Sequence, residues 1–222
     1  MKVLVVYWHP EPKSFNGAMF NQAVSALEAA GHEVKTSDLH AMDFNPVSGR
    51  HNFQTVRDPE FFKQQLEEMY ASDHDSFVPE LETEIQKVEW CDLLIFQFPL
   101  WWFSMPAVMK GWVERVFAMG RTYGGGRFYD NGVFKGKKAM LSLTMGGGED
   151  IYVKGGWNGD LEGILRPIHR GILEFNGFEV LEPFSVFGPA RMSQEQRVSE
   201  LERYSARLQN VFAEQGIAVG EY

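Results

Sequence analysis

The segment HPEPKSFN, residues 9–16, contains residue types that bind an anion at the start of a helix. A helix N-terminus presents unpaired backbone N–H groups and the positive end of the helix dipole. Ser14 and Asn16 add short polar side chains there. The segment therefore predicts a phosphate or pyrophosphate site, although a simple helix cap at Ser14 would give the same pattern. By itself, His9 is more typical of a hydrogen-bonded structural histidine than of a catalyst.

The segment PLWWFSMP, residues 99–106, puts three adjacent aromatic side chains, Trp101, Trp102 and Phe103, into a loop that follows an apolar run. Such side chains can form a wall for a flat ring, and the backbone N–H groups between them can donate to ring heteroatoms. Loop aromatics also commonly cover a core. Both interpretations stay open at this point.

The segment LTMGGGEDIYVKGGWNGD, residues 143–160, contains a glycine triplet, a glycine pair and an Asn-Gly step. Glycine loses more backbone entropy on folding than other residues, so ordinary packing does not favour this composition. Backbone without Cβ atoms lets a planar ligand approach closely and accept N–H hydrogen bonds. The alternative is a flexible hairpin tip.

Each of the three loops follows a predicted strand. Apolar runs and strand-forming residues predict five strands, at residues 2–8, 33–39, 92–98, 138–144 and 178–186. Helices are predicted from Ser14 to about Gly31 and at residues 106–117, 160–175 and 193–212. This alternation predicts an α/β fold with a doubly wound five-stranded parallel sheet and helices on both faces. Ligands bind such sheets at the carboxyl ends of the strands, where the three loops gather.

Residues 41–88 interrupt the alternation between the second and third strands. They contain two short predicted helices, at residues 59–70 and 79–88, and no clear strand. No linker composition divides the chain. We therefore expect a single domain over residues 1–222 with an insertion at 41–88.

The composition limits the partners and the compartment. The formal net charge is -9, from 30 acidic and 21 basic residues, which argues against a nucleic-acid or anionic-membrane surface. The single cysteine, Cys91, forms no internal disulfide and suits a reducing compartment. No targeting segment and no apolar stretch of roughly 20 residues is found, so we expect a cytoplasmic protein without membrane insertion.

An anion pocket, an aromatic shelf and a bare-backbone edge together fit a phosphorylated planar heterocycle. Flavin is the commonest such ligand in a five-stranded doubly wound domain. The sequence has no GxGxxG after the first strand and no GxxxxGK[ST] motif. These absences favour flavin over NAD or ATP as the resident cofactor.

Several long motifs resemble the NAD(P)H:quinone oxidoreductase (DT-diaphorase) family, which includes shorter bacterial quinone reductases and potassium-efflux ancillary proteins. The most specific is LIFQFPLWWFSMPAVMKGWVERVF, joined by HPEPKSFNGAM, SDLHAMDFNP, KKAMLSLTMGG and PIHRGILEFNGFEVLEP. The resemblance extends from about residue 2 to about residue 210. It implies a flavodoxin-like fold, tightly bound FAD, and a ping-pong relay from NAD(P)H to a quinone. It also implies a homodimer with its sites at the subunit interface.

The resemblance implies the following site residues, each at its matching position. The cofactor-binding set is His9, Lys13, Ser14, Phe15, Asn16, Pro99, Leu100, Trp101, Trp102, Phe103, Thr144, Met145, Gly146, Gly147, Tyr152, Arg197 and Leu201. The substrate-binding set is Trp102, Phe103, Arg121, Tyr123 and Phe175, of which Tyr123 and Phe175 match residues that reach toward the neighbouring subunit's site. The catalytic positions are Tyr152 and Asn158, and no metal site is expected.

The sequence departs from the animal enzymes of that family at informative positions. Asn158 stands where they have a histidine, and an amide can donate a hydrogen bond but takes up no proton near neutral pH. Our hypothesis is that Tyr152 and backbone N–H groups stabilise the negative charge on the reduced flavin. Trp101 replaces a glutamine, and Arg121 stands where a second substrate-facing tyrosine would be. The quinone pocket should therefore differ in shape and charge.

Two other functions remain compatible with the sequence. One is a regulatory or electron-carrier flavoprotein of the potassium-efflux ancillary type. The other is an FMN-dependent azoreductase or flavin reductase on the same fold. FAD is the expected flavin and FMN the less favoured one. The sequence contains no basic cluster that decides between NADH and NADPH.

Overall fold

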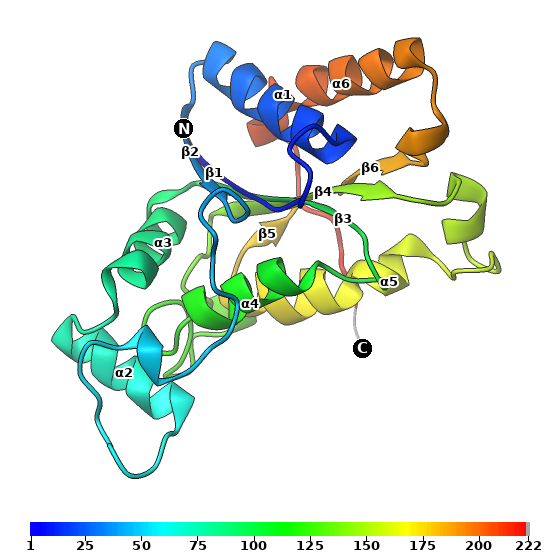
Figure 1. Cartoon of the computed structure of the whole chain (residues 1–222). Helices are drawn as coiled ribbons and strands as arrows, with labels where there is room; N and C mark the ends of the chain where they lie inside the picture. Colours follow the sequence, from blue (N-terminus) through cyan, green and yellow to red (C-terminus); the bar gives the residue numbers. More distant parts are fainter. Residues whose placement is uncertain (221–222) are drawn as a thin grey trace.

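The fold is built on one parallel sheet with helices on both faces (Figure 1). The computed structural model describes residues 1–220. The strand order is β2-β1-β3-β4-β5, β6 also pairs with β4, and all of these pairings are parallel. The strands are β1 (Lys2–Tyr7), β2 (Glu33–Asp38), β3 (Leu93–Pro99), β4 (Lys138–Met145), β5 (Glu179–Val180) and β6 (Phe184–Phe187). This order is that of a flavodoxin-like doubly wound sheet, and it confirms the predicted fold class.

The fifth position of the sheet is occupied by two short strands instead of the single predicted one. β5 pairs with the start of β4, and β6 pairs with its end. Pro183 lies between them and has no N–H to give to the ladder. One predicted strand therefore becomes two segments that run along the same neighbour.

The helices divide between the two faces of the sheet (Figure 1). α1 and α6 lie together on one face, and α3, α4 and α5 cover the other. The bounds are α1 (Phe15–Ala29), α2 (Gln64–His74), α3 (Pro79–Trp90), α4 (Ala107–Val116), α5 (Leu161–Ile168) and α6 (Gln194–Leu208). Ser14 caps α1 by accepting the Gly17 N–H at 3.1 Å, and Ser193 and Gln196 form the predicted capping box of α6.

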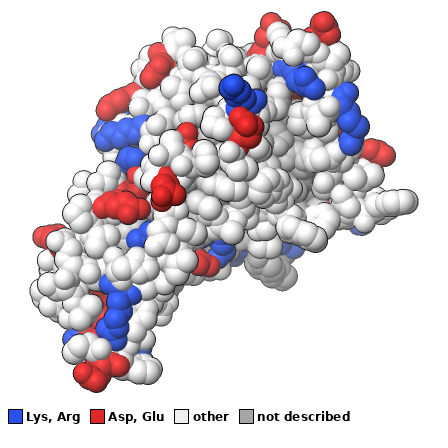
Figure 2. All heavy atoms as spheres, in the orientation of Figure 1, with Lys and Arg blue, Asp and Glu red and all other residues white. Residues whose placement is uncertain are grey.

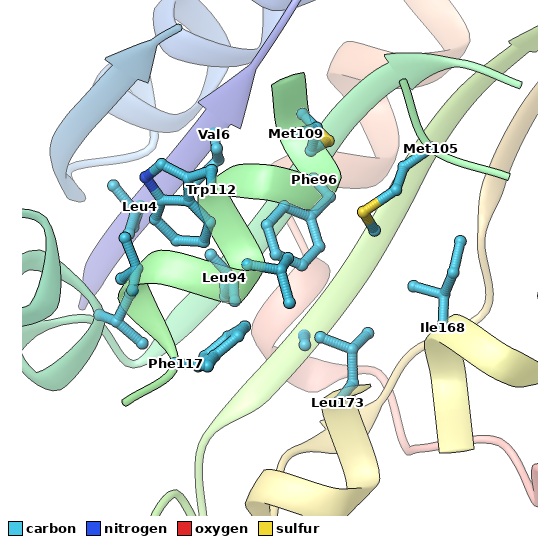
Figure 3. Close-up of a cluster of buried hydrophobic side chains, with 14 of the residues drawn as sticks. Leu4, Val6, Leu94, Phe96, Met105, Met109, Trp112, Phe117, Ile168 and Leu173 are labelled. Carbon is cyan, nitrogen blue, oxygen red and sulfur yellow. The ribbon is translucent and has the colours of Figure 1, made fainter. Parts of the chain in front are cut away.

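Alternate residues of the strands supply two hydrophobic cores, because successive side chains of a strand point to opposite faces. The core under α3, α4 and α5 includes Leu4, Leu94, Phe96, Trp112 and Leu173 (Figure 3). The core under α1 and α6 includes Val3, Val5, Ile95, Met140 and Tyr204. Their burial holds the sheet rigid, so the loops at its carboxyl edge start from fixed points.

The α1 face of the sheet changes from apolar to polar toward the carboxyl ends of its strands. Along β1 Val5 is followed on that face by Tyr7, along β3 Ile95 is followed by Gln97, and along β4 the last inward residue is Thr144. All of these residues are buried. Ligands bind doubly wound sheets outside this edge, so these buried polar groups lie next to the expected binding site.

The predicted insertion is smaller than residues 41–88. α3 packs on the sheet as the ordinary crossover helix between β2 and β3, so the added part ends before Pro79. Arg115 of α4 attaches the added part: its Nε donates to Asn52 Oδ1 at 2.8 Å and its guanidinium donates to the Asn45 carbonyl at 2.6 Å. The predicted helix at 59–70 begins later, at Gln64.

The predicted helix at residues 160–175 is not continuous. α5 ends at Ile168, a π-helical turn follows over His169–Leu173, and a 3-10 turn over Glu174–Asn176 ends the segment. Pro167 lies inside α5 and lacks the N–H of a regular helix, which favours the wider turn. His169 begins this turn, is 2% exposed, and has no hydrogen-bond partner for Nε2 among the described residues.

Burial of His169 predicts a loss of stability in mild acid. Desolvation lowers its pKa from 6.5 to about 4, so the imidazole stays neutral in the folded chain. Between pH 6.5 and 4 the unfolded chain binds this proton and the folded chain does not. The free energy of unfolding should therefore fall by about 2–3 kcal/mol over that range. Urea unfolding at several pH values measures the slope, and it should be shallower in His169→Gln. Equal slopes in both proteins would contradict this assignment.

The segment after α6 returns to the sheet and pairs with β5. The Ile217 N–H donates to the Val180 carbonyl at 2.8 Å, and Val219 is buried in the core.

Cys91 is also fully buried, and burial raises the pKa of its thiol to about 12, so the thiol is unreactive. Within residues 1–220, no helix combines the length and the apolar character needed to cross a membrane.

Candidate functional site

A cavity of about 600 Å³ lies at the carboxyl edge of the sheet, between the starts of α1 and α6. Its size falls in the range of small-molecule and cofactor sites. The lining combines three predicted loops with the segment that follows β6: His9, Lys13, Ser14, Phe15, Asn16, Ala18, Pro99, Leu100, Trp101, Thr144, Met145, Gly146, Pro189, Ala190, Gln194, Arg197, Val198 and Leu201. The predicted loops therefore do meet in one place.

The start of α1 provides an anion-binding end of the cavity. Ser14 Oγ accepts the Gly17 N–H, and the Ser14 carbonyl accepts the Ala18 N–H. Within residues 1–220, the N–H groups of Phe15 and Asn16 have no acceptor. Two unpaired N–H groups at the positive end of a helix dipole favour a negatively charged ligand group.

The charges around the cavity contrast with those of the whole chain. Lys13 and Arg197 line it, whereas the described lining contains no aspartate or glutamate, although the chain carries a net charge of -9. On the face shown in Figure 2, acidic and basic side chains are interspersed and form no continuous basic stripe. The cavity is thus a local cationic site on an acidic protein.

His9 extends the polar end of the cavity. His9 Nδ1 lies 3.0 Å from the Glu11 carbonyl oxygen and 3.0 Å from the Glu11 backbone nitrogen, so it donates to the first or accepts from the second according to the tautomer of the ring. Partial burial lowers the pKa of this imidazole. A neutral His9 carries a single N–H, and its tautomer decides whether Nε2 is a donor or an acceptor.

Trp101 and Leu100 form an apolar wall after β3. The Trp101 ring lies 5.4 Å from Trp8 and 6.1 Å from His9 between ring centroids. Trp101 and Ser104 exchange two backbone hydrogen bonds, of 3.1 and 3.0 Å, across a two-residue turn made by Trp102 and Phe103. This wall gives the cavity one flat side suited to an aromatic ring.

The turn at Trp102 and Phe103 is strained. Both residues are in the left-handed region, with φ of 50° and 57°, as a type I′ turn requires. Such turns favour Asn-Gly, and bulky side chains there cost energy. Trp102 is 96% exposed and Phe103 is 48% exposed, and neither lines the cavity. Strain and exposure of large rings at the end of a strand indicate a functional constraint.

The glycine loop serves two purposes. Gly146 lines the cavity, and a Cβ there would meet no protein atom within 4 Å, so open space lies beside it. At Gly147 a Cβ would lie 2.3 Å from Ile151 Cδ1 and 3.0 Å from the Tyr152 ring, so a side chain there requires these neighbours to shift. The prediction that the glycine triplet faces a ligand therefore fits Gly146 better than Gly147.

Tyr152 and Asn158 belong to the same glycine loop but do not line the cavity. The Tyr152 ring packs 5.8 Å from Phe187, and the Asn158 N–H donates to the Ile151 carbonyl at 2.9 Å. Their catalytic assignment stays a prediction. Both residues belong to the loop that follows β4, and Gly146 at the start of that loop lines the cavity.

Adding a methyl group at Gly147 should displace Tyr152 without unfolding the chain. We expect Gly147→Ala to lower catalytic turnover by about tenfold, because a shift of loop groups by a few tenths of an ångström misplaces them. Ile151→Val removes the Cδ1 atom of the closest approach and should restore part of the turnover in the double variant. Steady-state kinetics test this; wild-type turnover in Gly147→Ala would contradict it.

Tyr123 and Phe175 lie away from this cavity, in a second hollow of about 430 Å³ between α2, α4 and the π-helical turn. Their ring centroids are 5.7 Å apart. Buried Glu68 lines the same hollow, and burial raises the pKa of its carboxyl. The predicted substrate set thus separates into the exposed turn and this second hollow.

Arg121 is not placed to contact a substrate. Its guanidinium donates to both carboxylate oxygens of Glu82, at 2.9 and 3.1 Å, and of Glu89, both at 2.7 Å. It lines neither of the two hollows. We therefore correct the prediction: Arg121 fastens the chain after α4 to α3.

Sequence reasoning missed the segment after β6, which closes the far end of the cavity. Pro189, Ala190, Gln194 and Val198 come from the turn after β6 and the first turns of α6. The available signal was the GPARMSQEQ loop, which leaves the carboxyl end of a predicted strand as the other three loops do. Ala18 was also missed.

The residues present fit a flavin nucleotide. The unpaired N–H groups of Phe15 and Asn16, with Lys13 and Arg197, suit phosphate groups, whereas Trp101 and Leu100 with the open space at Gly146 suit a flat ring system. Among the described residues, no group of three or more potential ligands is arranged to hold a metal ion.

Fold and site together define a flavodoxin-like protein with a nucleotide-sized cavity at the carboxyl edge of its sheet. A family model described as "Flavodoxin-like fold" matches residues 1–208. The human ribosyldihydronicotinamide dehydrogenase [quinone] is 43% identical over 217 residues, covering 97% of this chain and 94% of the relative. The guinea pig (Cavia porcellus) NAD(P)H dehydrogenase [quinone] 1 is 44% identical, covering 96% and 78%. The chain belongs to this family of flavodoxin-like quinone dehydrogenases.

A solved structure agrees with this placement. A protein from Klebsiella pneumoniae, provisionally named a quinone reductase, superposes with a TM-score of 0.94 at 40% identity, covering 98% of this chain and 87% of its own. The resemblance stated from the motifs is thereby confirmed at the level of the family.

Proposed function

We propose that the protein is a flavin-dependent NAD(P)H:quinone oxidoreductase that binds FAD and works by a ping-pong scheme. The observation that carries this proposal is the cavity itself. It combines a cationic end at the N-terminus of α1 with an aromatic wall, in a protein that is acidic overall. The names of the relatives support the same reaction class. The cavity continues from α1 to the start of α6, which favours a dinucleotide such as FAD over FMN.

The chain's own residues have separable tasks in this proposal. Lys13, Arg197 and the first N–H groups of α1 bind the phosphate groups. Trp101 and Leu100 exclude water from one face of the ring system. A bound flavin supplies the hydride-accepting and hydride-donating chemistry that links NAD(P)H oxidation to quinone reduction. The protein's part is binding, orientation and electrostatics.

Tyr152 and Asn158 are proposed to act from the glycine loop. A phenol and an amide can each donate a hydrogen bond, but neither takes up a proton near neutral pH. They therefore stabilise negative charge next to the ring by donating hydrogen bonds, and the protons of the reduced quinone come from water. Tyr152→Phe should slow turnover, and unchanged rates would remove this role.

We also propose a homodimer in which the exposed aromatic turn is covered. Trp102 and Trp157 are 96% and 93% exposed, an unusual state for side chains of this size. Both belong to loops next to the cavity. Sedimentation velocity on the purified protein measures the mass directly; a monomer at micromolar concentration would contradict the dimer.

The function is tested by anaerobic stopped-flow mixing of the purified protein with NADH or NADPH and then with a benzoquinone. The absorbance of the bound flavin should bleach with the donor and recover with the quinone, and chromatography of the released flavin should give FAD. Released FMN would favour the azoreductase or flavin-reductase alternative. Flavin that neither donor bleaches would favour a regulatory or carrier role.

A further inference from the structure

Three buried polar side chains form a chain of hydrogen bonds that ends at the cavity. Gln97 Nε2 donates to Asn16 Oδ1 at 2.7 Å, and Asn16 Nδ2 donates to Thr144 Oγ1 at 2.5 Å. Gln97 is 0%, Asn16 3% and Thr144 6% exposed. The three residues come from β3, α1 and β4, so the chain ties the start of α1 to the sheet.

The polarity of this chain is determined by its middle member. An asparagine amide between two partners accepts on one side and donates on the other. In the observed polarity, Gln97 leaves only its Oε1 without a partner. In the reverse polarity both amides are turned, so that Asn16 donates to Gln97 Oε1 and accepts from Thr144. The buried NH₂ group of Gln97 then donates to neither Asn16 nor Thr144, and two unpaired donors replace one unpaired acceptor. Because each unpaired buried group costs free energy, the observed polarity is favoured.

The observed polarity has a consequence for Thr144. Its oxygen accepts from Asn16, so its own proton is free to be donated elsewhere. Within residues 1–220 no acceptor for that proton is found, and Thr144 lines the cavity. The Thr144 hydroxyl is therefore the end of the chain of hydrogen bonds that can donate to a ligand in the cavity.

We propose that Gln97 is a positioning residue that acts through Asn16 to fix the Thr144 hydroxyl as a hydrogen-bond donor to an acceptor atom of the bound flavin. The inference rests on the proposed function, because it takes flavin as the ligand of this cavity. Gln97 itself does not line the cavity, so its effect on the ligand is indirect. The polar end of β3 thus has a task beyond packing.

A double-mutant cycle on flavin affinity tests this proposal. FAD binding to the flavin-stripped protein is measured by quenching of flavin fluorescence. Thr144→Val should raise the Kd for FAD by about tenfold, the effect of one hydrogen bond. Gln97→Met should raise it about threefold, because the Thr144 hydroxyl is then no longer held in one orientation. In the Thr144→Val background, Gln97→Met should have no further effect.

Two controls separate positioning from structure. Thr144→Ser keeps the hydroxyl and should restore wild-type affinity. Ser142→Ala removes a buried hydroxyl from the same face of β4, outside the cavity, and should leave the Kd and the visible absorption band of the flavin unchanged. The band should differ between wild type and Thr144→Val.

The outcomes are distinguishable. If the wild-type protein binds no flavin, the proposed function fails and this inference fails with it. If wild type binds FAD while Thr144→Val binds equally well, or if the two substitutions are additive, the hydrogen-bond chain has no directing role although the proposed function stands. Thermal unfolding of each variant without flavin checks that the fold is retained.

Discussion

Reversing the two cationic side chains of the cavity should weaken FAD binding by two to four orders of magnitude. Lys13 and Arg197 are the lysine and arginine that line the cavity. The described lining contains no carboxylate, so their replacement leaves no carboxylate there without an ion-pair partner. A hydrogen bond to a charged group contributes about 1.5–3 kcal/mol, and two of them correspond to that range. The measurement is fluorescence titration of the flavin-stripped Lys13→Glu, Arg197→Glu double variant.

Two comparisons make this prediction specific. Lys35→Glu with Lys110→Glu changes the net charge equally outside the cavity and should leave the Kd for FAD nearly unchanged. Riboflavin has no phosphate groups, so its binding should be much less affected by the cavity variant. An equal loss of riboflavin and FAD affinity would show that the two side chains do not act on phosphate. Added salt should weaken FAD binding to wild type.

Replacing the aromatic turn by its preferred residues should stabilise the chain and largely abolish quinone reduction. Trp102→Asn with Phe103→Gly places Asn-Gly where both φ values are positive. Relief of the backbone strain should raise the free energy of unfolding by about 1–2 kcal/mol. The family resemblance assigns both rings to substrate binding, so their loss should lower kcat/KM for quinone by about a hundredfold.

Urea unfolding and steady-state kinetics measure the two effects on the same sample. Phe61→Ser is the matched control, because Phe61 is also a largely exposed aromatic side chain but lies in the added segment before α3. It should change neither quantity by much. If the Asn-Gly variant kept wild-type kcat/KM, the turn would have no part in substrate binding. Sedimentation of the variant also tests whether the turn supports the proposed dimer.

The strands and the three unusual loops were accessible from the sequence because each depends on local patterns. In β1 the valine-rich run from Val3 to Tyr7 is buried at every position, since both faces of the strand are covered. The residues that line the cavity along α1, β3 and β4 follow from the rule that ligands bind at the carboxyl edge. The family resemblance added Arg197 and Leu201, which also line the cavity and which no local pattern indicated.

Features that depend on residues distant in the sequence could not be predicted from it. Arg121 was assigned to substrate binding from the family resemblance. Its pairing with Glu82 and Glu89, which lie 39 and 32 positions away, is evident only in the structure. Asn16 lines the cavity, but the hydrogen bonds of its side-chain amide to Gln97 and Thr144 could not be predicted from the sequence. The π-helical turn after Pro167 likewise depends on packing that no short window of sequence encodes.

The pairing of Ile217 with Val180 has a bearing on self-association. In a parallel sheet the outermost strands expose unpaired N–H and C=O groups that can capture a strand of another molecule. On one edge, the Val180 carbonyl of β5 is already occupied by the Ile217 N–H. On the other edge, β2 carries the charged residues Glu33 and Lys35, which oppose the pairing of a strand from another molecule. The β2 edge and the β5 part of the other edge thus carry features that oppose edge-to-edge association, even though the aromatic turn is exposed.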